Sequence, residues 1–184
     1  MSTCLFCAQA WTLGSTKMCK ARSKSMIFIY FRRNDSFYFV RNVLLISMGI
    51  ALIGYGLYPT APPRLMPEWG FTDAISQFVT GGSGSIDFGP TKAFMNFYAA
   101  VPSMHVCFAV MIGGSMFRLV SWRPGKIAWA LYPLLVTFVV VVTANHYFTD
   151  VFLGALTAGI SALLAQRLLA PARPDAWAFV RATA

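Results

Sequence analysis

The segment Thr143-Ala144-Asn145-His146-Tyr147-Phe148-Thr149-Asp150 lies where one long apolar run, 127–145, gives way to another, 147–170. Each run has roughly the 20 residues that a helix needs to cross a bilayer, so the segment predicts the corner of a membrane-embedded helical hairpin. On a helix, residues four apart share one face, which would bring His146 and Asp150 together. A carboxylate in that position fixes the tautomer of an imidazole and leaves its other nitrogen free to react.

The composition of the whole chain agrees with a membrane setting. Its 184 residues are 57% hydrophobic and only 11% charged, whereas soluble domains carry about 25% charged residues. The formal net charge of +9 does not form a patch with interleaved aromatic residues, so we expect no nucleic-acid partner. The expected fold is an all-α, polytopic transmembrane helical bundle.

The apolar runs divide the chain into four full spans, at 37–57, 102–119, 127–145 and 147–170, preceded by a stub at 26–31 that is too short to cross. Apolar residues at helical spacing over 68–80 predict a short amphipathic helix, either on the extracytoplasmic membrane surface or packed on the bundle as a loop helix. We therefore expect a partly helical N-terminal segment over 1–31, a membrane-embedded domain over 32–170 and a cytoplasmic tail over 171–184.

Positive charge predicts how the bundle is oriented in a cell membrane. Seven basic residues precede or begin the first full span, namely Lys17, Lys20, Arg22, Lys24, Arg32, Arg33 and Arg41. Three more lie in the 118–126 turn and three near the C-terminus, whereas the opposite side holds only Arg64 and Lys92. By the positive-inside rule the basic side is cytoplasmic. Arg64, His105 and His146 should then share the extracytoplasmic face.

The polar residues expected at that face suit phosphate chemistry: Arg64, Lys92, Ser103, His105, Asn145, His146 and Asp150. A guanidinium matches phosphate oxygens, and the N-terminus of the second span adds backbone N–H groups, so these predict an anion site. His146, oriented by Asp150, could attack phosphorus as a nucleophile. His105, the only other histidine of the chain, could protonate the leaving oxygen as a general acid.

These residues resemble three motifs of the type 2 phosphatidic acid phosphatase superfamily. Asn96 to His105, ending Val-Pro-Ser-Met-His, resembles its second motif, commonly Pro-Ser-Gly-His, and His146 with Asp150 resembles the third. Tyr58-Pro-Thr-Ala-Pro-Pro-Arg64 is similar to the first motif of the inositolphosphotransferase branch, which includes inositol phosphorylceramide synthases. The resemblance implies a helical bundle, a phosphohistidine at His146, His105 as acid, Asp150 as its orienting partner and Arg64 as phosphate ligand.

The chain departs from the superfamily pattern at three positions. Leu57 stands where a lysine usually precedes the first-motif arginine, Val140 where an arginine usually precedes the third-motif histidine, and Met104 where the second motif has glycine. Arg64 should then carry most of the phosphate charge, with help from Lys92, while Thr143 and Asn145 could donate neutral hydrogen bonds. This reduced pattern favours the inositolphosphotransferase branch, with a phospholipid or a polyprenyl- or inositol-type phosphate as substrate and an N-terminally shortened chain.

Two alternatives to an active enzyme follow from the same residues. With four full spans where the superfamily has six helices, the chain could be a catalytically impaired fragment. Alternatively, His105 and His146 could ligate a haem or a metal from two spans. On the enzymatic interpretation we expect neither cofactor nor metal, and Cys4 with Cys7 lacks the second ligand pair that a zinc site needs.

Overall fold

Helices form almost all of the described chain. The structure, a computed structural model, describes residues 15–32, 34–66, 68, 70 and 100–179. The elements are α1 (Ser15–Arg32), α2 (Asn34–Leu57), η2 (Pro63–Leu65), α4 (Met104–Leu119), α5 (Arg123–Val142), α6 (Phe148–Leu163), its π-helical continuation η5 (Leu164–Leu169) and α7 (Pro174–Trp177). No strand occurs in these ranges, so the predicted all-α bundle is confirmed.

Among the described residues, three helices are long and apolar enough to cross a membrane, at Ser36–Leu57, Arg123–Val142 and Phe148–Leu169. They match the predicted first, third and fourth spans to within a few residues. The predicted second span is α4, which is apolar but has only 16 residues. Pro102, the first residue of the predicted span at 102–119, lies two residues before the helix begins.

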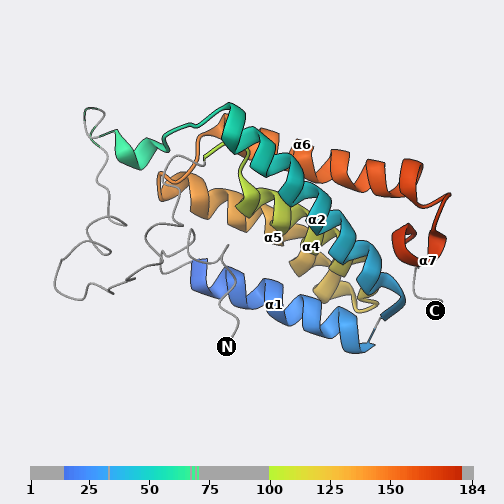
Figure 1. Cartoon of the computed structure of the whole chain (residues 1–184). Helices are drawn as coiled ribbons and strands as arrows, with labels where there is room; N and C mark the ends of the chain where they lie inside the picture. The colour runs from blue at the N-terminus through green and yellow to red at the C-terminus, as the bar shows by residue number, and fades with distance from the viewer. Residues whose placement is uncertain (1–14, 33, 67, 69, 71–99, 180–184) are drawn as a thin grey trace, which may run out of the picture.

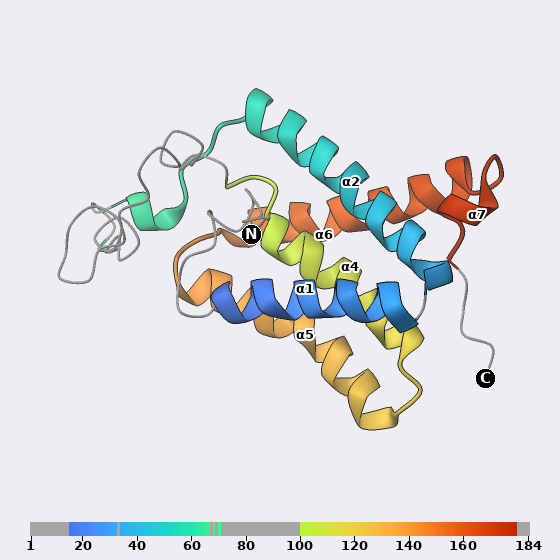
Figure 2. The same cartoon turned by 60° about the horizontal axis from the view of Figure 1, so that its bottom comes forward.

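Helix α4 is the centre of the bundle. It packs against α1, α2, α5 and α6, and Figure 2 shows it lying between α1 and α5 on one side and α2 and α6 on the other. Most of its side chains are buried, whereas α5 buries only Gly125, Val136 and Val140. Most of the surface of α4 faces other helices. Its apolar side chains are therefore buried against protein, and this packing stabilises its position although the helix is short for a membrane span.

Two glycines set how closely the neighbours approach α4. A Cβ atom at Gly113 would come within 2.9 Å of the Trp129 carbonyl oxygen on α5, and one at Gly154 on α6 would overlap the Ser103 carbonyl oxygen. Neither position can carry a side chain without moving backbone. Gly154 therefore fixes the start of α6 against the residue that precedes α4.

The predicted N-terminal stub at 26–31 is the end of a longer helix. Helix α1 begins at Ser15 and runs antiparallel to α2, so its first half points toward the end of the bundle where α2 finishes (Figure 1). Lysine and arginine are good helix formers, which is why this basic stretch continues the helix despite its lack of apolar periodicity. Lys17, Lys20 and Arg22 consequently do not gather at the end where α2 begins, contrary to the expectation from the charge count.

Residues 71–99 fall outside the described ranges. They include most of the predicted surface helix at 68–80 and Lys92. At the other end of the molecule, the predicted tail contains the short helix α7, which returns to α2: the Asn42 side chain donates to the Ala176 carbonyl at 3.0 Å.

Candidate active site

Three backbone hydrogen bonds join the loops at one end of the bundle. The N–H of Arg64, after α2, donates to the carbonyl of Ala144 between α5 and α6 at 2.9 Å. Ser103 N–H, before α4, donates to the Asp150 carbonyl at 3.0 Å, and Ala100 N–H donates to the Thr60 carbonyl at 3.3 Å. Segments far apart in the sequence are thus held together by main-chain atoms.

The turn between α5 and α6 differs from the prediction that His146 and Asp150 share one face of a helix. Helix α5 ends at Val142, and Ala144 adopts a left-handed conformation with φ of 52°. The Val140 carbonyl then accepts from the N–H groups of both Asn145 (3.0 Å) and His146 (3.2 Å). His146 therefore lies in the turn and not on a helical face shared with Asp150, because the chain reverses before Tyr147, the N-cap of α6.

His146 and Asp150 nevertheless face each other. His146 Nδ1 lies 3.4 Å from Asp150 Oδ2, with the two side chains only 6% and 1% exposed. The carboxylate is held by two donors, the Tyr147 N–H to Oδ2 (3.0 Å) and the Thr149 hydroxyl to Oδ1 (3.2 Å). It also lies in the first turn of α6, where the helix dipole favours negative charge. The Nδ1 atom makes no hydrogen bond within the described residues, so the carboxylate faces it at 3.4 Å without a hydrogen bond.

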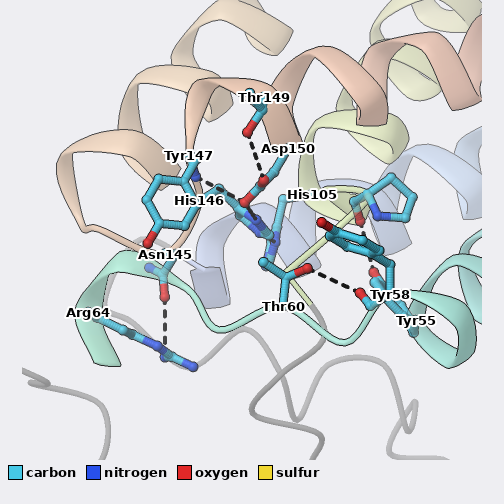
Figure 3. Close-up of polar contacts among 11 residues, drawn as sticks. Tyr55, Tyr58, Thr60, Arg64, His105, Asn145, His146, Tyr147, Thr149 and Asp150 are labelled. Atoms are coloured by element: carbon cyan, nitrogen blue, oxygen red, sulfur yellow. Dashed lines mark hydrogen bonds and ion pairs between the residues drawn. The ribbon is translucent and has the colours of Figure 1, made fainter. Parts of the chain in front are cut away.

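The two histidines are in direct contact. His105 Nδ1 and His146 Nε2 are 3.2 Å apart, and the rings meet edge to face with their centroids 5.3 Å apart. A hydrogen bond at this distance requires one ring to donate and the other to accept. His146 is thus placed between Asp150 on its Nδ1 side and His105 on its Nε2 side (Figure 3).

Ser103, whose N–H donates to the Asp150 carbonyl, carries a buried hydroxyl. It is the N-cap of α4 and 0% exposed, yet its side chain does not cap the helix. Within the described residues its Oγ has no hydrogen-bond partner. A buried hydroxyl without a partner is costly, so this group is a candidate donor to a polar ligand.

Arg64 is connected to the same turn through its side chain. Its Nη1 donates to Asn145 Oδ1 at 3.3 Å, and Asn145 Nδ2 in turn donates to Thr143 Oγ1 at 2.6 Å. The Thr143 hydroxyl donates to the Val139 carbonyl on α5 at 2.7 Å. Figure 3 shows Arg64 and Asn145 beside the histidine pair at the same end of the bundle.

One supporting residue escaped the sequence analysis. Tyr55, near the end of α2, donates its hydroxyl to the Pro102 carbonyl at 3.0 Å and so ties α2 to the segment that precedes α4. The sequence shows only a tyrosine near the end of an apolar span, and such a tyrosine is equally typical of a residue at the membrane interface.

Six of the seven predicted site residues come together in the structure: Arg64, Ser103, His105, Asn145, His146 and Asp150. Lys92, the seventh, lies outside the described residues.

Comparison with known proteins gives one match. The family model described as the PAP2 superfamily matches residues 23–164. No curated protein matches the chain, and no solved structure does.

Proposed function

Since that match covers most of its length, the chain belongs to the PAP2 superfamily, and from this premise we propose that it cleaves or transfers lipid phosphoesters through a phosphohistidine at His146. Membership supports a lipid phosphatase-like enzyme in the membrane, and the apolar helices make the chain an integral membrane protein. The observation that carries the mechanism is the row formed by Asp150, His146 and His105, with contacts of 3.4 and 3.2 Å.

In the first step, His146 Nε2 attacks phosphorus and forms a P–N bond while the P–O bond to the leaving alcohol breaks. His105 gives its proton to the leaving oxygen as general acid. The attacking ring becomes positively charged, and Asp150, buried beside Nδ1, offsets that charge. The substrate phosphate must enter between the two rings, which are in contact without it.

In the second step, an acceptor hydroxyl attacks the phosphohistidine. His105, now neutral, removes the proton of that hydroxyl, a P–O bond forms, and the P–N bond breaks to restore His146. With water as the acceptor the enzyme is a phosphatase. With an alcohol such as inositol or a sugar, or a lipid hydroxyl, the same step makes it a transferase.

Three kinds of donor would hold the phosphate. The Arg64 guanidinium supplies charge, the Ser103 hydroxyl is buried without a hydrogen-bond partner in the described chain, and the start of α4 supplies backbone N–H groups. The uncatalysed hydrolysis of phosphate esters is among the slowest biological reactions, so both covalent catalysis and charge stabilisation are needed.

We place the enzyme in the inositolphosphotransferase-like branch, acting at the extracytoplasmic face. The branch is supported by the segment that ends at Arg64 and by the reduced set of cations in the motifs. The face is supported by charge: among the described residues, Arg32, Arg41, Arg118, Arg123, Lys126, Arg167 and Arg173 lie at or near the end away from the site, whereas Lys17, Lys20 and Arg22 in the first half of α1 do not. By the positive-inside rule that end is cytoplasmic.

The test is a head-group release and exchange assay on a panel of phospholipids in detergent micelles, with and without inositol. We expect turnover by the unmodified chain and none by the His146→Ala variant, with an acid-labile phosphoryl adduct only in the former. Phe148→Ala, which removes a 75% exposed side chain two residues away, serves as the control. Undiminished turnover by His146→Ala would contradict the mechanism.

Vanadate separates an active site from an impaired one, because it mimics pentacoordinate phosphorus. Binding that is weakened but still measurable in Arg64→Ala supports the phosphate site, whereas no binding by the unmodified chain favours the impaired alternative. The haem alternative gains no separate support from the described residues, because it rests on the same two histidines.

A further inference from the structure

We propose that Thr143 and Asn145 are positioning residues that hold the Arg64 guanidinium in place for phosphate, an inference that rests on the proposed function. The three side chains form a relay that ends on the backbone of α5: Arg64 to Asn145 at 3.3 Å, Asn145 to Thr143 at 2.6 Å and Thr143 to the Val139 carbonyl at 2.7 Å. The sequence analysis had assigned Asn145 to the substrate itself.

The donors and acceptors allow the relay only one direction. A guanidinium can only donate, so the Asn145 amide must turn its oxygen toward Arg64 and its nitrogen toward Thr143. The Thr143 hydroxyl gives its single proton to the Val139 carbonyl, so toward Asn145 it can only accept. Each group thus fixes the orientation of the next, from the helix backbone out to Arg64.

The same turn also holds Arg64 through its backbone. Arg64 N–H donates to the Ala144 carbonyl at 2.9 Å, and Ala144 lies between Thr143 and Asn145 in the chain. Main chain and side chain are therefore both attached to the turn between α5 and α6. An arginine fixed at two points loses less conformational entropy when it binds an anion, which is how preorganisation raises affinity.

The location of the relay points to positioning rather than to stability. Thr143 is exposed and Asn145 half-buried, and hydrogen bonds at exposed positions contribute little to folding. Arg64 is the only lysine or arginine among the described residues of this end's loops, 58–66, 100–103 and 143–147. Its orientation therefore decides much of the charge that phosphate meets there.

The experiment compares Thr143→Val, which keeps the shape but removes the hydroxyl, with Thr143→Ser, which keeps the hydroxyl, and adds Asn145→Ala. Each is made with Arg64 present and in an Arg64→Ala background. The readouts are the vanadate dissociation constant, KM and kcat on a lipid phosphate, and the midpoint of unfolding in detergent.

We expect Thr143→Val and Asn145→Ala to raise the vanadate Kd and the KM by about three- to tenfold, the size expected for one hydrogen bond. The unfolding midpoint and kcat should change little, and Thr143→Ser should restore binding. With Arg64→Ala, neither Thr143→Val nor Asn145→Ala should weaken vanadate further, because no guanidinium remains to be positioned.

The proposal is overturned if Thr143→Val binds vanadate as tightly as the unmodified chain does, or if Thr143→Ser loses as much vanadate affinity as Thr143→Val. It is also overturned if Thr143→Val or Asn145→Ala still weakens vanadate binding in the Arg64→Ala background. A chain that binds vanadate but turns over no lipid phosphate contradicts the proposed function alone, because the relay is still tested by vanadate affinity. A chain that binds no vanadate contradicts both.

Discussion

The two ends of the bundle are held together by different kinds of contact. At the site end, the loops are joined by backbone hydrogen bonds, such as Arg64 N–H to Ala144 and Ser103 N–H to Asp150. At the opposite end, the C-terminal segment is held by side chains: Phe179 meets Phe39 edge to face at 5.4 Å, and Arg118 lies over the Phe179 ring at 5.5 Å.

This difference shows where the molecule requires accurate placement. Main-chain bonds between buried segments fix positions closely, because their geometry leaves little freedom. Arginine stacked on an aromatic ring tolerates shifts and is worth about 0.5–1 kcal/mol when exposed. The site end is therefore constrained in geometry, and the opposite end serves to anchor the tail and to carry positive charge.

The strongest test of this contrast replaces a carboxylate at each end. Asp150→Asn keeps the size of the side chain but removes the charge that faces His146, so we expect kcat to fall roughly a thousandfold. Asp175→Asn, an exposed change in α7, should leave kcat unaltered. Turnover on a lipid phosphate in micelles measures both, and equal effects would abolish the distinction between the two ends.

A smaller effect is expected from adding one methyl group at the site end. Gly154→Ala places a Cβ against the Ser103 carbonyl oxygen, so the start of α6 must move away from α4. We expect a loss of about 1–3 kcal/mol in unfolding free energy, as for other overpacked cores, together with reduced turnover. Gly159→Ala is the control, since nothing lies within 4 Å of its Cβ position.

Denaturant titration in detergent would measure both glycine variants. Equal stability of Gly154→Ala and Gly159→Ala would show that the two helices do not need their close approach.

The smallest effect belongs to the opposite end. Arg118→Ala removes the contact with Phe179 and should cost about 0.5–1 kcal/mol of stability, with turnover unaltered because the site is distant. Arg123→Ala, which removes a positive charge at the same end without a described ring contact, is the matched control. Loss of activity in Arg118→Ala would mean that the two ends are coupled.

Sequence was sufficient for the parts of this fold that depend on hydrophobic length. The apolar runs located α2, α5 and α6 within a few residues, because a span is defined by how much hydrocarbon it must cross. The start of α1 was missed because this part of the helix is basic and has no apolar periodicity, so neither the length nor the spacing of apolar residues reveals it.

The turn at Ala144 shows why the local structure of the site was harder to predict. Left-handed positions usually carry glycine or asparagine, so an alanine there gives no signal in the sequence. The helical interpretation of His146 and Asp150 was therefore wrong in conformation, although it correctly placed the two side chains together.

The grouping of the site residues was predictable, but their partners were not. Topology alone brings Arg64, His105 and His146 to one end of a bundle of antiparallel helices. The contact between Arg64 and Asn145 joins residues 81 positions apart, and it depends on how the turn folds. No periodicity or charge count contains that information.

The backbone bonds at the site end also bear on how this protein can diverge. Because main-chain atoms join Arg64 to Ala144 and Ser103 to Asp150, a change of side chain at neighbouring positions leaves the framework in place. Met104, where glycine is common, occupies the first position of α4 without disturbing the bond that Ser103 makes to Asp150. Neighbouring side chains can therefore be exchanged in the descendants of this chain while the two histidines keep their placement.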